Sequence, residues 1–322
     1  MRVLITGGSG YIGSFTARRM IAAGHTVTIY DNLSSGHRDT VPGANFVHAD
    51  LKDIDQLDQL LVGSRIEAVM HFAASCYVGE SVLQPVKYYA NNLLNGFHLI
   101  ERVRRHKIAK FVFSSTCAVY GEPQSNTLDE SHPKHPMSPY GNTKLATELM
   151  LADYAPAYGI GVAMLRYFNA AGASLDGNYG ESHLPETHLI PLILDVALGK
   201  REQIDIFGAD YATPDGTCIR DYVHVEDLAE AHVQALAKIT PGIATAYNVG
   251  TGQGYSVLEV IRTCEEVTGR KIAYRLAPRR AGDPPRLVAD ARKIAAELGW
   301  KPKYPDLRSI VETAWDWHRQ RG

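Results

Sequence analysis

Residues 2–13 of this chain read RVLITGGSGYIG. The first five are a short apolar run with β-branched members, which predicts a buried parallel strand. The glycines that follow are spaced G-x-x-G-x-x-G, and the next residues have a helical apolar pattern. A strand, a glycine turn and a helix N-terminus together form a pyrophosphate cradle, because backbone N–H groups and the helix dipole face the anion. The stretch therefore predicts a dinucleotide site.

An acidic residue indicates which dinucleotide binds. Residues 26–30 predict the second strand, and Asp31 follows it directly. A carboxylate there accepts hydrogen bonds from the adenosine ribose hydroxyls and repels a 2′-phosphate, which favours NAD over NADP. Asp50 follows a third predicted strand, residues 45–48, from where it could reach the adenine. The alternative for Asp31 is that it only caps a turn.

Strand-like and helix-like runs alternate through the first half of the chain, with further strands predicted at residues 68–71, 110–113 and 161–165. This alternation predicts an α/β fold with a doubly wound parallel sheet of the Rossmann type, whose ligands lie beyond the carboxyl ends of the strands.

A second domain is expected where the amino-acid composition of the sequence changes. Residues 170–188 form a looser stretch rich in Gly, Asn, His and Pro. We predict an NAD-binding domain over residues 1–168 and a smaller α/β substrate domain over mainly residues 169–322. Segments near residues 219–250 are expected to return to the first domain.

Tyr140 and Lys144 lie one turn apart on one face of a predicted helix. Lowering the phenol pKa of about 10 by roughly three units takes about 4 kcal/mol. One cation about 4 Å away supplies that much at an effective dielectric of about 20. The pair therefore predicts a tyrosine tuned for general acid/base catalysis, with Thr116 converging on it from a strand end. The alternative is an aromatic ring packed on a lysine stem.

Composition excludes several classes of function. The 33 basic and 35 acidic residues balance, so neither nucleic acid nor a membrane surface is an expected partner. The four cysteines, Cys76, Cys117, Cys218 and Cys264, show no C-x-x-C spacing and no zinc pattern, and we expect no metal. Scattered thiols, with no signal peptide and no apolar run of membrane-spanning length, favour the cytoplasm.

The chain resembles the extended short-chain dehydrogenase/reductase family, and within it the branch that epimerises UDP-sugars at C4. The motifs that carry this resemblance run nearly end to end, at residues 7–13, 30–33, 71–74, 79–81, 88–92, 113–116, 140–144, 166–169, 220–225 and 280–283. Their order and spacing are specific for the extended family.

The resemblance implies three sets of site residues. The catalytic residues are Thr116, Tyr140 and Lys144. The NAD-binding residues are Gly7, Gly10, Tyr11, Ile12, Gly13, Asp31, Asn32, Asp50, Leu51, Phe72, Ala73, Ala74, Asn91, Ser114, Tyr140, Lys144 and Tyr167. The UDP-sugar-binding residues are Thr116, Tyr140, Phe168, Asn169, His188, Leu189, Arg220, Arg280, Asp283 and Leu287.

The implied reaction is transient oxidation at C4. The tyrosine takes the C4 hydroxyl proton while hydride passes to NAD⁺, and a 4-keto intermediate turns over and is reduced on its other face. Dehydratases of the family carry Asp and Glu after the Thr, whereas this chain has Cys117 and Ala118. Alternatives are an epimerase of UDP-pentoses or UDP-uronates, and a non-catalytic NAD sensor, which typically loses the Tyr and Lys.

Three positions depart from the family pattern or tune it. His188 stands where a typical epimerase has an Asn that contacts the UDP-sugar, and Cys76 stands where many members have a Lys near the NAD pyrophosphate. Leu287 occupies a gate position where a bulky Tyr excludes N-acetyl sugars, so we expect activity on UDP-N-acetylglucosamine. Leu287 could instead be an ordinary apolar residue of a strand at residues 287–289. The resemblance also implies a homodimer through helices around residues 92–105 and 145–158.

Overall fold

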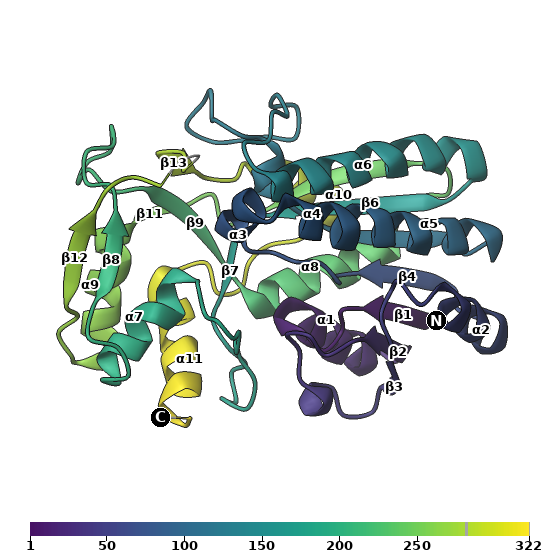
Figure 1. Cartoon of the computed structure of the whole chain (residues 1–322), viewed down its shortest axis with the longest axis horizontal. Coiled ribbons are helices and arrows are strands. Elements are labelled where there is room, and N and C mark those ends of the chain that lie inside the picture. The colour runs from purple at the N-terminus through teal and green to yellow at the C-terminus, as the bar shows by residue number, and fades with distance from the viewer. Residues whose placement is uncertain (281–282, 322) are drawn as a thin grey trace.

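The computed structural model describes residues 1–280 and 283–321, which form a larger and a smaller domain side by side (Figure 1). The larger domain contains a seven-stranded sheet in the order β10-β6-β5-β4-β1-β2-β3, with all neighbouring strands parallel. Its strands are β1 (Arg2–Thr6), β2 (Thr26–Asp31), β3 (Asn45–His48), β4 (Ala68–His71), β5 (Lys110–Thr116), β6 (Gly161–Tyr167) and β10 (Ala244–Val249).

The strand order reverses between β1 and β4. The strands β1, β2 and β3 follow one another toward one edge of the sheet, and β4 pairs with β1 on its other side. The doubly wound parallel sheet expected from the sequence is confirmed. Such a reversal opens a crevice beyond the carboxyl ends of the two strands, which is where ligands of these sheets bind.

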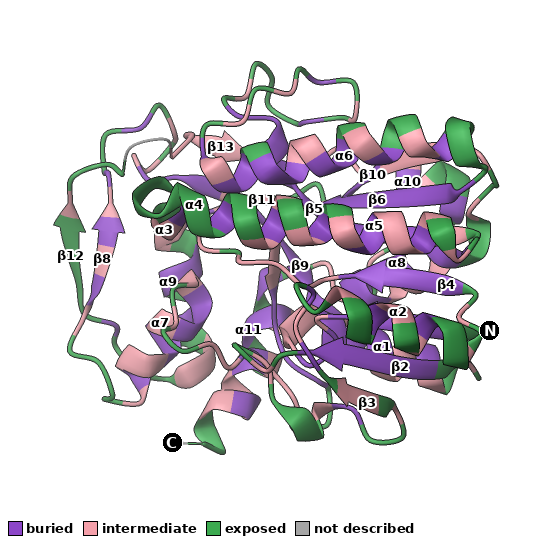
Figure 2. Ribbon diagram, turned by 45° about the vertical axis from the view of Figure 1, so that its right-hand side comes forward, coloured by how far each residue is buried: buried purple, intermediate pink, exposed green. Residues whose placement is uncertain are grey.

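Helices cover both faces of this sheet, which explains why its strands are apolar along their length. In β1 the side chains of Val3 and Ile5 pack into the core on one face, and Leu4 packs into the core on the other. Figure 2 shows the inner strands of this sheet buried, the edge strand β3 partly exposed, and the outer helix faces exposed. The first face is covered by α1 (Tyr11–Ala22), α8 (Val225–Lys238) and α10 (Arg292–Leu298), and the second by α2 (Ile54–Ser64), α5 (Asn95–Arg105) and α6 (Pro139–Tyr158).

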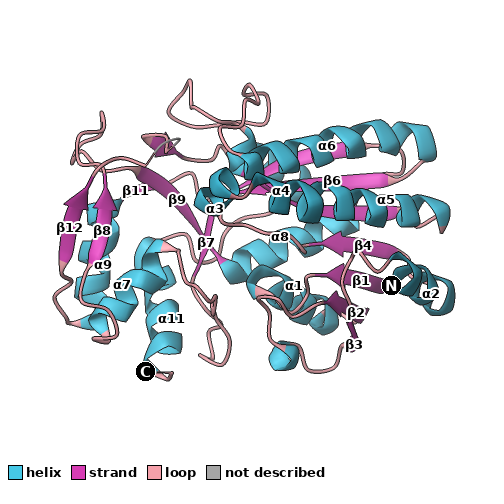
Figure 3. Cartoon of the chain, in the orientation of Figure 1, coloured by secondary structure: helices cyan, strands magenta, loops and turns pink. Residues whose placement is uncertain are grey.

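The smaller domain mixes helices and strands around a core of its own (Figure 3). In it β9 pairs with β7, β11 and β13, and β8 pairs with β12. Its elements are β7 (Asn169–Ala171), α7 (Leu189–Ala197), β8 (Ile204–Phe207), β9 (Ile219–His224), β11 (Gly254–Ser256), α9 (Val257–Thr268), β12 (Tyr274–Ala277), β13 (Arg286–Leu287) and α11 (Leu307–Arg319). The predicted second α/β domain is confirmed.

The chain passes between the domains more than once. After β9 in the smaller domain, α8 and β10 belong to the larger one, and α10 returns to it again. The boundary at residues 168/169 stays a prediction. Short helical segments complete the fold: η1 (Arg38–Thr40), α3 (Val78–Leu83), α4 (Pro85–Tyr88), the π-helical turn η2 (Tyr89–Leu94) and η3 (Cys117–Val119).

The strand considered at residues 287–289 is wrong in its bounds, because β13 spans Arg286–Leu287. Beyond Leu287 the chain pairs with a different segment: the N–H of Leu128 donates to the carbonyl of Val288, and Leu128 and Ala289 form an isolated bridge. Leu287 thus ends its strand beside the segment that follows β5.

Candidate active site

The glycine turn joins the carboxyl end of β1 to the N-terminus of α1. Gly7 has φ +72°, and a Cβ there would lie 2.4 Å from the backbone nitrogen of Ala73. A Cβ on Gly13 would lie 2.2 Å from the Gly7 carbonyl oxygen, whereas one on Gly10 would meet nothing closer than 3.4 Å. Gly7 and Gly13 therefore allow the turn to close, whereas a Cβ at Gly10 would make only an ordinary contact with the protein. No side chain caps α1 at Gly10, so the first amides of the helix stay available to an anion.

Asp31 is buried at the carboxyl end of β2 and supports the glycine turn. Its carboxylate accepts hydrogen bonds from the Ser9 N–H at 2.9 Å and the Leu33 N–H at 2.8 Å. Beside it, the Asn32 amide donates to the Asp50 carboxylate at 2.9 Å. Asp31 thus caps a turn, as in the alternative, and still places a carboxylate where a ribose is expected. Its ribose role stays a prediction.

A small recess of about 20 Å³ opens beside the glycine turn. Gly10 and Tyr11 line it from the larger domain, and Ser182 and His183 line it from the segment between β7 and α7. The Tyr11 hydroxyl donates to the Gly172 carbonyl at 2.6 Å, which ties the start of α1 to that same segment. The predicted dinucleotide site therefore lies where the two domains meet.

Thr116, Tyr140 and Lys144 come together at the carboxyl end of β5 and the first turns of α6, and all three are buried. Ser138 caps α6, accepting from the Gly141 N–H at 3.2 Å, and Pro139 opens it. The Lys144 ammonium donates to the Ser114 carbonyl at 2.8 Å and lies 5.9 Å from the centre of the Tyr140 ring. Position and burial agree with the predicted acid/base group.

The electrostatics of this trio differ from the expectation. Burial raises the pKa of Tyr140 well above its usual value, although a hydrogen bond with Thr116 acts in the opposite direction. Burial also lowers the pKa of Lys144 from 10.5 to about 8. Desolvation of the phenol therefore acts against the predicted lowering of its pKa by Lys144, whose ammonium is bonded to a carbonyl. The role of Lys144 in tuning Tyr140 stays a prediction. A further positive charge beside the phenol would favour its ionised form.

The other predicted NAD residues lie along the same edge of the sheet. Ala73, after β4, contacts the glycine turn, and the hydroxyls of Ser114 and Tyr167 are 2.6 Å apart. Asn91, in η2, donates to the Ser75 hydroxyl at 3.3 Å. Phe72 packs its ring 4.8 Å from that of His232. The remaining residues of this set, Ile12, Leu51 and Ala74, are buried or half-buried in the adjoining segments.

The predicted diphosphate contacts gather around one carboxylate. Arg220 reaches Asp283 at 2.8 Å, and Arg280 reaches its other oxygen at 3.4 Å. The Arg220 side chain is 13% exposed and that of Arg280 is 61% exposed. Two guanidinium groups on one carboxylate leave a net positive charge. Residues 281 and 282, the middle of the sequence motif, lie outside the described residues.

The predicted sugar contacts lie nearer the catalytic trio. Phe168 is buried in a cluster with Cys117, the residue after Thr116, and Leu287 packs against that cluster. Asn169 donates its amide to the Asp221 carbonyl at 3.0 Å. Leu189 opens α7 directly after His188.

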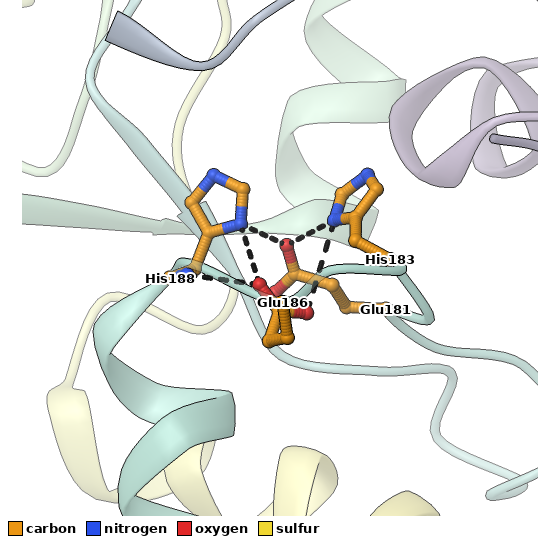
Figure 4. A group of neighbouring side chains, drawn as sticks. All are labelled: Glu181, His183, Glu186 and His188. Carbon is orange, nitrogen blue, oxygen red and sulfur yellow. Dashed lines mark hydrogen bonds and ion pairs between the residues drawn. The ribbon is translucent and has the colours of Figure 1, made fainter. Parts of the chain in front are cut away.

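His188 has two carboxylate partners (Figure 4). Its Nδ1 lies 2.7 Å from Glu181 and 3.0 Å from Glu186. Burial lowers the pKa of His188, but the two carboxylates outweigh it and raise the pKa well above its usual value, which favours the positively charged imidazole. Cys76 is accessible, yet the surrounding protein desolvates its thiol and raises its pKa. Cys76 is therefore a neutral thiol at the position where many family members have a Lys, and His188 is a cation at the position where a typical epimerase has an Asn.

Residues 3–250 match the sequence profile of the NAD dependent epimerase/dehydratase family. The chain belongs to this family. It is 49% identical to the UDP-glucose 4-epimerase of Halalkalibacterium halodurans over 99% of this chain and 96% of that protein. It is 47% identical to the UDP-glucose 4-epimerase of Corynebacterium glutamicum, over 98% and 95%. The resemblance seen in the motifs is confirmed.

Solved structures of this epimerase/dehydratase family agree along the whole chain. The UDP-glucose 4-epimerase from Brucella ovis in complex with NAD is 46% identical, with a TM-score of 0.93 over 98% of this chain and 97% of that one. The UDP-Glc/GlcNAc 4-epimerase from Campylobacter jejuni is 42% identical, with a TM-score of 0.86 over 99% of each chain.

Sequence reasoning missed two groups of residues at this family's site. Glu148 of α6 forms a buried ion pair with Arg166 of β6 at 2.6 Å and also accepts from the Ser115 hydroxyl, which fixes the helix that carries Tyr140. Glu181, His183 and Glu186 surround His188; their spacing, E-x-H-x-x-E-x-H over residues 181–188, was present in the sequence as a signal. Among the described residues, no helix is long and apolar enough to span a membrane.

Proposed function

We propose that this chain is an enzyme that interconverts UDP-glucose and UDP-galactose by NAD-dependent epimerisation at C4. The observation that carries the proposal is the joint burial of Thr116, Tyr140 and Lys144 at the carboxyl end of the sheet, within the domain that holds the glycine turn. The full-length similarity to proteins named UDP-glucose 4-epimerase supports the same activity.

The residues at the glycine turn fit NAD. Gly10 leaves space for a pyrophosphate, the uncapped N-terminus of α1 offers backbone donors, and Asp31 supplies an acceptor that disfavours a 2′-phosphate. Bound there, NAD supplies a hydride acceptor and, when oxidised, a positive charge. Asn32 and Asp50, joined by their hydrogen bond, extend the site toward the adenine.

Tyr140 is the proton acceptor in the proposed reaction. Its phenol is buried, so it stays protonated until added positive charge offsets the desolvation. Because bound NAD would carry a positive charge only when oxidised, ionisation of Tyr140 is favoured in that state. It is also the state in which the C4 hydroxyl must lose its proton. The same group returns the proton when the 4-keto intermediate is reduced.

Lys144 and Thr116 support the tyrosine in different ways. The ammonium of Lys144, held on the Ser114 carbonyl at 2.8 Å, adds positive charge on the Tyr140 side of the cleft. Thr116 has its hydroxyl near the phenol and also accepts from the Ala118 N–H at 3.1 Å, which orients it. It positions the C4 oxygen and shares its developing charge.

Binding energy for the substrate comes from the diphosphate in this proposal, so that the sugar is free to turn. Arg220 and Arg280 carry one more positive charge than Asp283 neutralises, and guanidinium groups match diphosphate oxygens. The charged His188 adds a cation on the same wall, and Asn169 a neutral contact.

Acceptance of N-acetyl sugars is a second candidate activity. Leu287 packs against Phe168 and Cys117 near Thr116, and it lacks the ring of a gate tyrosine. The similar Campylobacter jejuni protein is a UDP-Glc/GlcNAc 4-epimerase. UDP-pentoses and UDP-uronates remain alternatives for the same chemistry.

A homodimer is proposed for the face formed by η2, α5 and α6. Large apolar side chains are exposed there: Leu94 and Phe97 on one side, Leu149 and Tyr158 on the other. Burying them against a second copy removes this apolar surface from water. Sedimentation or light scattering should give twice the chain mass, and Phe97→Glu with Leu149→Glu should give monomers.

We place the enzyme in the cytoplasm. Cys76, Cys117, Cys218 and Cys264 are all free, and Cys76 is exposed, which suits a reducing compartment. Fractionation of cells that express the protein should recover its activity with the soluble cytoplasmic fraction.

The proposed function is tested with purified protein and a panel of UDP-sugars. We expect conversion of UDP-galactose to UDP-glucose without added cofactor, and acid extraction should release NAD and not NADP. Lower rates with UDP-pentoses or UDP-uronates are compatible with this outcome. No turnover of UDP-galactose, with turnover of another UDP-sugar, would replace the substrate assignment.

A further inference from the structure

Residues 181–188 bring two glutamates and two histidines together in one short loop between β7 and α7 (Figure 4). One donor atom from each of Glu181, His183, Glu186 and His188 lies within 4.8 Å of the other three. Both imidazoles present Nδ1 to the carboxylates. The proposed epimerase reaction uses His188 alone and leaves this arrangement unexplained.

The distances are close to those of a metal centre. Nδ1 of His188 lies 2.7 Å from Glu181 and 3.0 Å from Glu186, and Nδ1 of His183 lies 3.0 Å from Glu181 and 3.9 Å from Glu186. Ligands of a tetrahedral Zn²⁺ with bonds of about 2.0–2.1 Å are about 3.4 Å apart. The three shorter pairs need a small outward movement, and the longest a small inward one, to reach coordination spacing.

The loop is held in place from outside the cluster. The Trp317 indole N–H donates to the Glu181 carbonyl at 2.9 Å, and the Tyr77 hydroxyl donates to the Pro185 carbonyl at 3.1 Å. Within the loop itself, the Glu186 carboxylate accepts from the N–H groups of Thr187 and His188 at 2.7 and 2.8 Å. The donors are thus largely preorganised, and little chain entropy is lost when an ion binds.

We propose that Glu181, His183, Glu186 and His188 bind one divalent transition-metal ion of the Zn²⁺ type. Imidazole nitrogen with carboxylate oxygen suits Zn²⁺ and Co²⁺ better than Mg²⁺, which prefers oxygen ligands and retained water. Each imidazole binds through Nδ1 and keeps its proton on Nε2, and any second imidazole proton leaves to solvent. Two carboxylates and two neutral imidazoles then balance the charge of the ion.

The proposed metal site lies beside two aromatic side chains of the larger domain. The His183 ring lies 6.3 Å from that of Tyr11 in the glycine turn and 6.2 Å from that of Tyr77. Binding at Nδ1 leaves the Nε2 N–H of His188 free to contact substrate. In the metal-bound state His188 is neutral, and the ion supplies the positive charge that the protonated imidazole supplies in the metal-free protein. The inference does not depend on the epimerase activity.

The test is titration of chelator-treated, untagged protein with ZnCl₂ and CoCl₂, followed by calorimetry and by the visible absorption of bound Co²⁺. We expect one equivalent to bind, more tightly as the pH rises because ligand protons must leave. MgCl₂ at the same concentration should not compete. Glu181→Gln and His183→Gln should each weaken binding by more than about 100-fold, beyond the 10–100-fold loss that an outer-shell change causes.

Exposed residues of the same types provide the matched controls. Glu202→Gln and His135→Gln lie outside the cluster and should bind the metal as the wild type does. Circular dichroism of the metal-free variants checks that each is folded, and the milder His188→Gln replaces any variant that is not. Absence of stoichiometric binding by the wild type would overturn the proposal. So would equal affinity in a folded cluster variant and the wild type.

Discussion

At the candidate active site, the two domains shift the pKa values of their ionisable side chains toward opposite forms, neutral in the larger domain and charged in the smaller. On the large-domain wall, burial shifts Tyr140 and Lys144 toward their neutral forms, raising the pKa of the phenol and lowering that of the ammonium to about 8. Among the described residues, no carboxylate forms an ion pair with Lys144. On the facing wall, carboxylates raise the pKa values of His188 and Arg220 and keep both side chains charged.

The contrast separates groups that exchange protons from groups that bind charge. A residue that gives and takes a proton needs its protonated and deprotonated forms close in free energy. For Tyr140, burial favours the protonated phenol, and a positive charge that is present only in the oxidised state of the site favours the phenolate. A residue that holds a diphosphate needs to stay ionised through the cycle, and a fixed counterion does that. Changes on the first wall should therefore alter turnover, and changes on the second should alter binding.

The largest effect is expected for Tyr140→Phe. Removing the hydroxyl removes the proton acceptor, and general acid/base catalysis alone contributes about 10²–10⁴-fold, so kcat should fall by at least that factor. A coupled assay of UDP-galactose conversion measures it, with circular dichroism and bound NAD as checks on folding. Wild-type turnover in this variant would remove Tyr140 from the chemistry.

Lys144→Met should lower kcat less than Tyr140→Phe does. It should also shift the pH optimum of kcat upward, because the phenol loses a nearby cation. The same change should stabilise the cofactor-free protein at pH 7. The folded-state pKa of Lys144 is lowered from 10.5 to about 8, so burying its charge destabilises the fold below pH 8, by up to about 3 kcal/mol.

This cost disappears as the pH rises from about 8 to 10.5, where the unfolded chain binds more protons than the folded chain. Urea unfolding at pH 7 and pH 10 measures the difference between variant and wild type. A difference that does not shrink at pH 10 would contradict the burial argument, whatever the activity.

Arg280→Leu tests the facing wall. Loss of a charge-assisted contact of about 1.5–3 kcal/mol should raise KM for UDP-galactose about 10- to 100-fold and leave kcat nearly unchanged. Arg279→Leu, whose guanidinium pairs with Asp210, is the neighbouring control and should change neither. If KM is unchanged, Arg280 is only a surface partner of Asp283.

The smallest and most selective effect is expected for Leu287→Tyr. The ring should fill space near Phe168 and Cys117, suppress activity on UDP-N-acetylglucosamine and spare UDP-galactose. Leu287→Met is the control of similar volume. A wild-type enzyme that converts UDP-galactose but not UDP-N-acetylglucosamine would refute the gate argument.

Local patterns were predictable from the sequence. Residues 2–6, 45–48 and 68–71 are expected as strands and form β1, β3 and β4 with those bounds. In β1 and β4 the largely apolar sequence suits strands that helices cover on both faces. Tyr140 and Lys144 are related by helical spacing, which a sequence displays directly.

Properties set by distant residues could not be predicted. The pKa of Tyr140 depends on burial and on Tyr167 and Cys76, which lie far from it along the chain. The pairing of Arg220 with Asp283 spans 63 residues, and that of Arg166 with Glu148 joins a strand to a helix.

The double role of Asp31 limits how this protein can change cofactor over evolution. The carboxylate expected to repel a 2′-phosphate is also the acceptor for the N–H groups of Ser9 and Leu33. A single substitution toward NADP thus removes two hydrogen bonds from the first βα unit at the same step. We expect Asp31→Ala to melt at a lower temperature and to gain no measurable NADP binding, so that a switch of cofactor requires a rebuilt turn before, or together with, the loss of the acid.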